Sequence, residues 1–309
     1  MRRVSISGLA QAAGVLTMLF SLLTLLQSDF HGLQLFTHFR LQYFVVSALL
    51  VVAFVLLRDR RYAVLMFATA FINGAHVLPW YFDEPYSAGG RELTLVQANV
   101  LSTNTDFEGL FALLDTAQPD VVVLQEVSPA WAQELKRLHN TYPHRIIEER
   151  DDNFGIAVLS KYALTAAAVV ASEPLKFPTI VATLDVSGRR LQLVATHPMI
   201  PLGPRNYADR NTQLETVANL LRRSVGARIV VGDLNASPWD LHYKALEART
   251  GLRNVRRGFG VMPTWPTFLP IAMIPIDHVL VSSEVGVVDA RTGPRIGSDH
   301  LPLVVTLTL

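Results

Sequence analysis

Side chains that can bind a metal ion or transfer a proton recur where apolar, β-branched runs of this sequence end. In the stretch VVGDLNASPWD, residues 230–240, Asp233 and Asn235 follow such a run directly after Gly232. A charge at the end of a buried strand is unfavourable unless a partner or a ligand compensates for it. Residues of the same types end, begin or follow other apolar runs, namely Asn99, Glu126, His197, Asp277, Asp299 and His300.

The chemistry of these side chains indicates a site for a hard cation and an oxyanion. Carboxylate and amide oxygens are preferred ligands of Mg²⁺ and Mn²⁺, and histidines are suited to proton transfer near neutral pH. Each residue alone has an ordinary explanation, such as an Asx-turn for Asp233 or a helix cap for Glu126. Their repeated position at strand ends instead predicts that they converge on one rim of a sheet.

The elements that must position these residues are short strands separated by helices. Eight apolar runs bounded by Gly, Pro or Asp predict strands: residues 93–99, 121–126, 155–160, 179–186, 191–197, 228–233, 276–282 and 302–309. Four amphipathic or capped segments predict helices: residues 106–117, 128–138, 205–224 and 239–248. The sequence SGRR joins two of the strands as a hairpin. This order predicts a mixed α/β domain whose sheets pack together.

Composition excludes some chemistry and divides the chain. The 309 residues include no cysteine, which excludes disulfides, thiolate catalysis and Cys-based zinc sites. Only 17% of residues are charged, against about 25% in an average domain, so part of the chain must be very apolar.

The apolar part is the N-terminus, where residues 4–28, 41–57 and 62–82 contain no Asp, Glu, Lys or Arg. Because a membrane-spanning helix needs about 17–25 apolar residues, we predict three transmembrane helices. A cleaved signal peptide is the alternative for the first, but that stretch is long and two more apolar runs follow it. The polar residues Asn73 and His76 in the third run are expected to make helix–helix contacts.

Arginines flanking these runs predict the orientation. Five lie on one side and two on the other: Arg2, Arg3, Arg58, Arg60 and Arg61 against Arg40 and Arg91. By the positive-inside rule the N-terminus is cytoplasmic, and three crossings then place the rest of the chain outside. We therefore expect a membrane anchor at residues 1–85, a linker at 83–90, and an extracytoplasmic catalytic domain at 91–309.

Several short motifs resemble one known family. QANV, LQEV, GIAVLS, THP, GDLNASP, IDHVLVS and IGSDHLP occur in the order typical of the endonuclease/exonuclease/phosphatase superfamily, whose fold is DNase I-like. The resemblance extends over residues 91–309. It implies a four-layer α/β sandwich, with two mixed β-sheets flanked by helices, and hydrolysis of a phosphoester or phosphoanhydride with a divalent metal.

The resemblance also implies a role for each candidate metal residue. Glu126 matches the metal-binding glutamate of the family, and Asn99 matches the asparagine beside it. Asp299 matches a further metal or site carboxylate. The implied cofactor is Mg²⁺ or Mn²⁺.

The remaining candidates match catalytic positions of the family. Asp233 corresponds to the aspartate that aligns or activates water, and Asn235 to the asparagine that holds the phosphate. His300 corresponds to the histidine that works with Asp277, either as a base or as a phosphate clamp. His197 corresponds to a second histidine that contacts phosphate or protonates the leaving group.

Other polar and aromatic residues are expected to be structural. His278 neighbours Asp277 in a strand, so its side chain points to the opposite face. Arg210 and Gln213 are expected on a solvated helix face rather than at a phosphate. Trp265 is expected to pack.

The charge of the catalytic domain and the apolar N-terminus bear on the choice of substrate. Residues 91–309 carry 21 Lys and Arg against 22 Asp and Glu, a net charge of −1, whereas nucleic-acid binders usually have a basic face. The chain resembles bacterial membrane-anchored members of the superfamily. We therefore expect a lipid-linked phosphate as substrate and the lipid bilayer as partner, and no protein partner is evident. The alternatives are an extracytoplasmic nuclease and a non-catalytic membrane sensor or scaffold.

Overall fold

Two six-stranded mixed sheets form the body of the protein in this computed structural model, which describes residues 5–26, 29–222 and 224–309. The first sheet has the order β11 (Gly286–Thr292), β12 (Leu303–Thr308), β1 (Glu92–Asn99), β2 (Val121–Gln125), β4 (Ile156–Ser160) and β3 (His144–Glu148). The second has the order β5 (Leu164–Ser172), β6 (Phe177–Val186), β7 (Arg189–Ala195), β8 (Ala227–Asp233), β10 (Asp277–Val281) and β9 (Arg253–Asn254). The β1–β2 and β7–β8 pairs are parallel and the others antiparallel.

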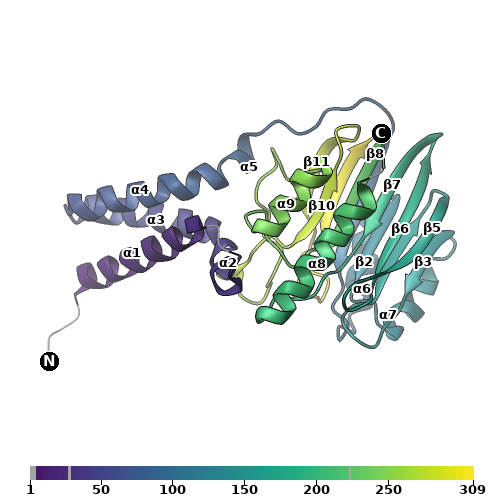
Figure 1. Cartoon of the computed structure of the whole chain (residues 1–309), viewed down its shortest axis with the longest axis horizontal. Helices are drawn as coiled ribbons and strands as arrows, with labels where there is room; N and C mark the ends of the chain where they lie inside the picture. The colour runs from purple at the N-terminus through teal and green to yellow at the C-terminus, as the bar shows by residue number, and fades with distance from the viewer. Residues whose placement is uncertain (1–4, 27–28, 223) are drawn as a thin grey trace.

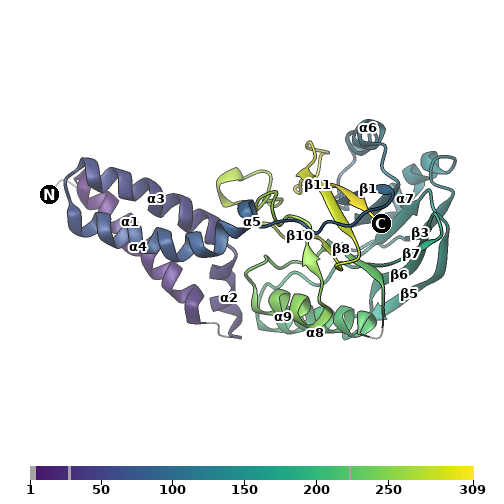
Figure 2. The same ribbon diagram turned by 90° about the horizontal axis from the view of Figure 1, so that it is seen from above.

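Helices cover the outer face of each sheet. These are α6 (Phe107–Ala117), α7 (Pro129–Glu134) and the 3₁₀ turn η2 (Leu135–Leu138) on the first sheet, and α8 (Pro204–Leu221) and α9 (Leu241–Thr250) on the second. Figure 2 shows α6 on one side of the sheets and α8 and α9 on the other. A third apolar core, with Leu95, Val123, Leu193 and Val231, lies between the sheets. The mixed four-layer arrangement expected from the sequence is confirmed.

Helices α7 and α9 begin where the sequence supplies a cap. The Ser128 side chain accepts from the backbone N–H of Trp131, and Pro129 occupies the first helical position of α7. The Asp240 carboxylate accepts from the backbone N–H groups of His242 and Tyr243 at the start of α9. Such caps satisfy donors that have no partner within the helix.

The N-terminal part consists of helices that extend away from the sheets (Figure 1). They are α1 (Ile6–Leu23), η1 (Thr24–Leu26), α2 (His31–Thr37), α3 (Arg40–Leu56), α4 (Arg60–Val77) and α5 (Pro79–Phe82). We call this region, through Phe82, the helical part. The expected role of Asn73 in helix contacts is confirmed, because its Nδ2 donates to Ser21 Oγ of α1 at 2.6 Å.

The prediction of three membrane spans is wrong for the described residues. Residues 6–26 form the one helix long and apolar enough to cross a bilayer, or there are two spans if α2 and α3, bent by 56°, count together. In α4 the apolar run is interrupted by polar side chains, since the helix begins at Arg60 and Arg61 and contains Asn73 and His76. The extracytoplasmic orientation depended on three crossings and does not follow. Val4, Gln27, Ser28 and the flanking Arg2 and Arg3 lie outside the described residues.

The helical part is fixed against the sheets by apolar and polar contacts. Trp80 stacks edge-on against Trp239, with ring centroids 6.5 Å apart. The indole nitrogen of Trp239 donates to the carbonyl of His76 at 3.1 Å. Gln42 Nε2 donates to the carbonyl of Met273 at 2.7 Å. The helical part therefore has a defined position relative to the strand ends.

Candidate active site

The eight candidate residues of the sequence gather at one rim of the paired sheets. Asn99 ends β1, Glu126 follows β2, His197 follows β7 by two residues and Asp233 ends β8. Asp277 begins β10 rather than ending it, and is the direct partner of Asp233 because β8 and β10 are antiparallel. His300 likewise precedes β12, which runs antiparallel to β1.

Asp233 lies at the centre of this group. Its Oδ2 is 3.5 Å from His197 Nε2 and 3.7 Å from His300 Nε2, and it accepts a hydrogen bond of 3.2 Å from Asn99 Nδ2. Its Oδ1 accepts from the backbone N–H of Asn235 at 2.9 Å. The buried carboxylate thus faces two imidazoles, one from the loop after β7 and one from the loop before β12.

His197 has unused hydrogen-bonding capacity. The ring is buried, and neither nitrogen has a hydrogen-bond partner among the described residues. Burial by itself would lower the pKa of His197, but the negative charge of Asp233, whose Oδ2 lies 3.5 Å from Nε2, and that of Glu126 outweigh burial and raise it. A buried polar group without a partner is unfavourable, so this histidine is suited to bind an anionic group from a ligand.

His300 and Asp277 form a buried pair. His300 Nδ1 donates to Asp277 Oδ2 at 2.8 Å, and Asp277 Oδ1 accepts from Gln97 Nε2 at 2.7 Å. Burial alone would lower the pKa of His300, but the charge and hydrogen bond of Asp277, with Asp233 and Asp299 nearby, raise it to about 9. The imidazolium likewise holds the pKa of Asp277 below its usual range, although burial opposes this.

Replacing Asp277 with asparagine should therefore lower the pKa of His300 from about 9 toward 6.5. Because the folded-state pKa of His300 is raised, its contribution to stability is complete below about pH 6.5 and is lost as pH rises through 9. In metal-free protein with EDTA, the melting temperature should fall over this pH range in the wild type and much less in Asp277→Asn. An NMR titration of His300 that is identical in both proteins would contradict this assignment.

Two carboxylates are held close together by Asn99. Its Nδ2 donates to Glu126 Oε1 at 3.0 Å and to Asp233 Oδ2 at 3.2 Å, so these two oxygens are at most 6.2 Å apart. Glu126 Oε2 accepts from the backbone N–H of Ser102 at 3.0 Å. Asn99 Oδ1 accepts from the N–H of Leu101. Asn99 thus contacts both carboxylates through a donor and positions them.

The donor set is suited to a hard divalent cation. Asp299 Oδ2 accepts from the indole of Trp265 at 2.9 Å, whereas its buried Oδ1 has no hydrogen-bond partner among the described residues. Asp233, Asp277 and His300 also offer ligand atoms within 4.8 Å of one another. In that second set the Asp277–His300 hydrogen bond occupies an atom of each residue. Glu126 and Asp299 line the same cavity, where further carboxylate oxygens are available to a cation.

Three residues at the rim have positive φ angles, which are unfavourable for most residue types. Glu126 and Asn235 have φ values of 61° and 48°, in the left-handed region that is unfavourable for residues with a Cβ. Gly232 has φ 154°, and a Cβ there would collide with the carbonyl oxygen of Thr196. Strained backbone of this kind is concentrated at functional sites. Here it flanks the two carboxylates.

The rim opens into a cavity of about 210 Å³, which we call the site cavity. Its polar side is formed by Glu126, Asn153, His197, Asp233, Asn235, Asp299 and His300, and its other side by Leu35, His38, Leu101, Ile200, Pro201, Leu202, Trp265, Ile274 and Ile276. Leu35 and His38 belong to the helical part, so a segment far from the strands in sequence lines the same cavity.

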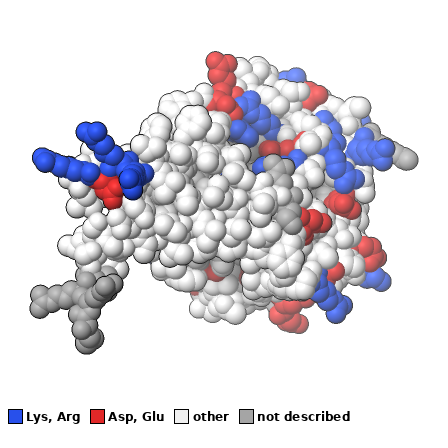
Figure 3. All heavy atoms as spheres, turned by 60° about the vertical axis from the view of Figure 1, so that its left-hand side comes forward, with Lys and Arg blue, Asp and Glu red and all other residues white. Residues whose placement is uncertain are grey.

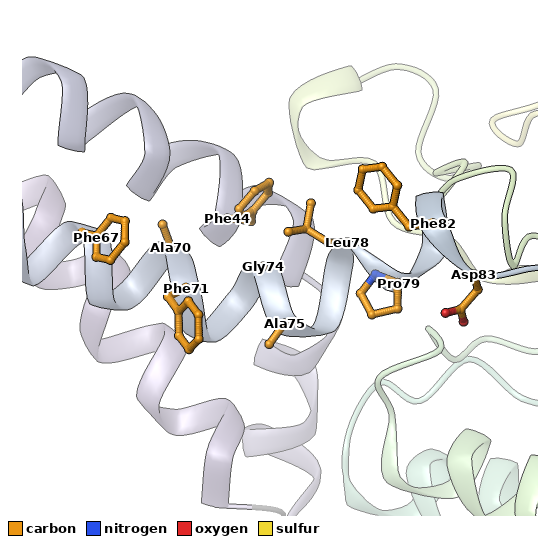
Figure 4. A pocket seen from close by; sticks show the side chains of 10 residues that line it. All are labelled: Phe44, Phe67, Ala70, Phe71, Gly74, Ala75, Leu78, Pro79, Phe82 and Asp83. Atoms are coloured by element: carbon orange, nitrogen blue, oxygen red, sulfur yellow. The ribbon is translucent and has the colours of Figure 1, made fainter.

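A larger cavity of about 540 Å³ lies elsewhere, along α4. Figure 4 shows four phenylalanines in its lining, Phe67 and Phe71 on α4, Phe44 on α3 and Phe82 on α5, with Asp83 at its end. Apart from Asp83 its lining has no titratable side chain. The smaller cavity, where the carboxylates and imidazoles meet, is therefore the candidate active site.

Several expectations for residues outside the site need correction. Arg210 is fully buried rather than solvated, and donates to Asp240 Oδ2 at 3.0 Å and to the carbonyl of Asn235 at 3.1 Å. Gln213 is also buried and accepts from the N–H of Met199. Both brace the loops that carry site residues. Trp265, which was expected to pack, lines the cavity wall and donates from its indole nitrogen to Asp299 Oδ2.

Other residues behave as expected or were missed. His278 is structural as predicted, since its Nε2 is 2.7 Å from the carbonyl of Ala236 on the far face of the sheet from the site. Gln97, which holds Asp277, was missed, although its position two residues before Asn99 puts both on one face of the strand. Leu35 and His38 had no sequence signal, because they lie in the apolar N-terminal part.

Comparison with known proteins identifies the class to which this fold and site belong. A family model described as the endonuclease/exonuclease/phosphatase family matches residues 96–300, and the chain belongs to that family. The superfamily expected from the motifs is thus confirmed. Phosphoric ester hydrolysis is the chemistry that this family name denotes.

Individual relatives extend the comparison. Tyrosyl-DNA phosphodiesterase 2 from Danio rerio is 29% identical over 217 residues, 63% of this chain and 55% of that protein, so this chain spans about half the length of that relative.

Two solved structures share the fold. D. rerio TDP2 complexed with a single-strand DNA product is 21% identical, with a TM-score of 0.62, and the match covers 71% of this chain and 99% of that chain. Sphingomyelinase C from Streptomyces griseocarneus is 18% identical, with a TM-score of 0.52, and the match covers 70% of this chain and 99% of that chain.

Proposed function

We propose that this protein is a divalent-metal-dependent hydrolase that cleaves a phosphoester or phosphoanhydride of a lipid or lipid-linked phosphate at a membrane surface. One observation carries the proposal. The site cavity joins a rim of carboxylates and imidazoles to an apolar wall that includes Leu35 of the helical part. An amphiphile with a phosphate at one end and hydrocarbon next to it matches such a two-sided cavity.

The residues of the rim have complementary proposed roles. With its raised pKa, His300 is protonated at neutral pH and acts as a phosphate clamp rather than as a base. Asp233 orients the attacking water and accepts its proton as the new P–O bond forms. Asn235 holds the phosphate through its amide, and His197 gives a proton to the departing oxygen.

The proposed metal residues are Glu126 and Asp299, with Asn99 holding Glu126 in place. A bound Mg²⁺ or Mn²⁺ would neutralise charge on the non-bridging oxygens of the phosphate. Asp277 keeps His300 in one orientation and stabilises its charged form. These roles follow the family resemblance, and the position of Asp233 within 3.7 Å of both imidazoles supports them.

The surface around the cavity supports membrane attachment. Leu202 in the cavity wall is 69% exposed, and Phe268 and Ile271, in the loop between Trp265 and Ile274, are 73% and 83% exposed. On the face shown in Figure 3, most of the helical part is free of charged side chains. Those that it carries there gather at its end away from the sheets. Such apolar surface is typical of a membrane contact, and the helix at residues 6–26 is apolar enough to cross a bilayer.

A second candidate is a nuclease or other nucleic-acid phosphodiesterase. It is favoured by the similarity to tyrosyl-DNA phosphodiesterase 2 and by the related structure that holds a DNA product. The apolar wall of the cavity argues against a polyanionic substrate. A non-catalytic sensor is disfavoured, because the rim retains its full set of carboxylates and imidazoles.

The test compares substrates with the full chain reconstituted in lipid vesicles with Mg²⁺. We expect turnover of polyprenyl pyrophosphate or phospholipid to exceed cleavage of plasmid DNA by about tenfold or more, since a membrane tether raises the effective concentration of lipid substrates. Leu35→Ser and Leu202→Ser should lower lipid turnover more than turnover of bis-p-nitrophenyl phosphate. Val225→Ser, an exposed apolar residue outside the cavity, is the control. Rapid DNA cleavage without lipid turnover would favour the nuclease.

A further inference from the structure

His38 connects the helical part to the loop that follows Asp233. It lies between α2 and α3, is only 5% exposed, and lines the site cavity together with Asp233 and Asn235. Its Nδ1 is 2.9 Å from Ser237 Oγ and 3.3 Å from the backbone nitrogen of Ser237. Residues 199 positions apart thus meet at the active site.

These contacts determine the tautomer of the ring. A backbone N–H can only donate, so Nδ1 of His38 must accept from Ser237 and carries no proton. The hydroxyl of Ser237 can rotate to donate to the same nitrogen. In the neutral ring the proton is therefore on Nε2.

Both hydrogen bonds of His38 to residues that the structure describes use Nδ1, so its Nε2–H is left to donate to another group. Because His38 lines the site cavity, water or a ligand in the cavity can accept from it. The cavity that His38 lines is also the one that contains the phosphate-binding candidates Asn235 and His197. A phosphate bound beside these two residues offers anionic oxygens that accept such a hydrogen bond.

We propose that His38 binds the substrate by donating a hydrogen bond from Nε2 to a phosphate oxygen. The inference rests on the proposed phosphohydrolase function and adds a substrate-binding residue that the helical part supplies. The helical part then does more than attach the enzyme to a membrane, because it completes the phosphate-binding site. Ser237 fixes the ring so that the donor is already oriented when the substrate arrives.

Two substitutions separate substrate binding from a purely structural contact. In His38→Asn the amide oxygen can still accept from Ser237, but the distal donor is lost. We expect kcat/KM for the accepted phosphoester to fall about 10- to 100-fold, the range for a hydrogen bond to a charged group, and KM to rise. His38→Gln retains a distal donor and should recover part of the loss. His31→Asn, in the same helical segment and outside the cavity lining, is the control.

Inorganic phosphate provides a test on the unmodified protein. With ¹⁵N-labelled histidine, the Nε2–H signal of His38 should shift when phosphate is added, and His38→Asn should bind phosphate about tenfold more weakly. An unchanged Nε2–H signal, or an unchanged KM in a folded His38→Asn variant of an active enzyme, would overturn the inference while leaving the hydrolase in place. Wild-type protein that hydrolyses no phosphorylated substrate would instead overturn the proposed function.

Discussion

Replacing Asp233 with asparagine is expected to lower kcat on the accepted phosphoester by about 10³-fold, within the range for loss of a proton-transfer group. The substitution preserves shape and can keep the contact with the backbone N–H of Asn235. It removes the negative charge that lies between His197 and His300. Without that charge the water is neither oriented nor deprotonated, so the loss should be in kcat rather than in KM.

The control for this variant is Asp115→Asn, which changes an exposed carboxylate on α6. Both proteins should retain the circular dichroism spectrum of the wild type. Asp233→Asn should also lower the pKa of His300, because one of the charges that raise it is gone. Full hydrolytic activity in Asp233→Asn would show that another residue activates the water.

Replacing Glu126 with glutamine is expected to lower kcat/KM by about 10²- to 10³-fold at a fixed Mg²⁺ concentration, as expected when charge stabilisation of the transition state is weakened. The carboxylate that accepts from Asn99 and from the N–H of Ser102 becomes a neutral amide. A weaker metal ligand should raise the Mg²⁺ concentration for half-maximal activity by about tenfold or more. Excess Mg²⁺ should then restore part of the activity.

The appropriate control is Glu149→Gln, which alters an exposed glutamate outside the site cavity. EDTA should abolish activity in the wild type, and added Mg²⁺ or Mn²⁺ should restore it. If Glu126→Gln has the same Mg²⁺ dependence as the wild type, the cation is held by other groups, and Asp233, Asp277 and His300 become the next candidates.

The sequence predicted the central strands of both sheets but missed their edges. The four strands without a prediction are β3, β5, β9 and β11, and each lies at the edge of a sheet. Edge strands are partly exposed and often charged or small, as in HRIIE at residues 144–148 and LTAAAVVAS at 164–172. They lack the continuous apolar run that identifies a strand buried on both faces.

The sequence by itself determined the α/β architecture, the family motifs and the eight residues of the rim, since strand ends and residue types are local properties. Only the tertiary structure decided how they meet. The antiparallel pairing of β8 and β10 puts the start of one strand beside the end of the other, so Asp277 lies opposite Asp233.

The sequence also did not predict which polar residues are buried or which distant segments contact each other. Arg210 was expected in solvent, but Asp240 pairs with it inside the protein, because a partner elsewhere in the chain decides whether a charge can be buried. Leu35 and His38 reach the site cavity because the helical part folds back against the loop after β8. No local pattern encodes such a contact, since it depends on the packing of segments about 200 residues apart.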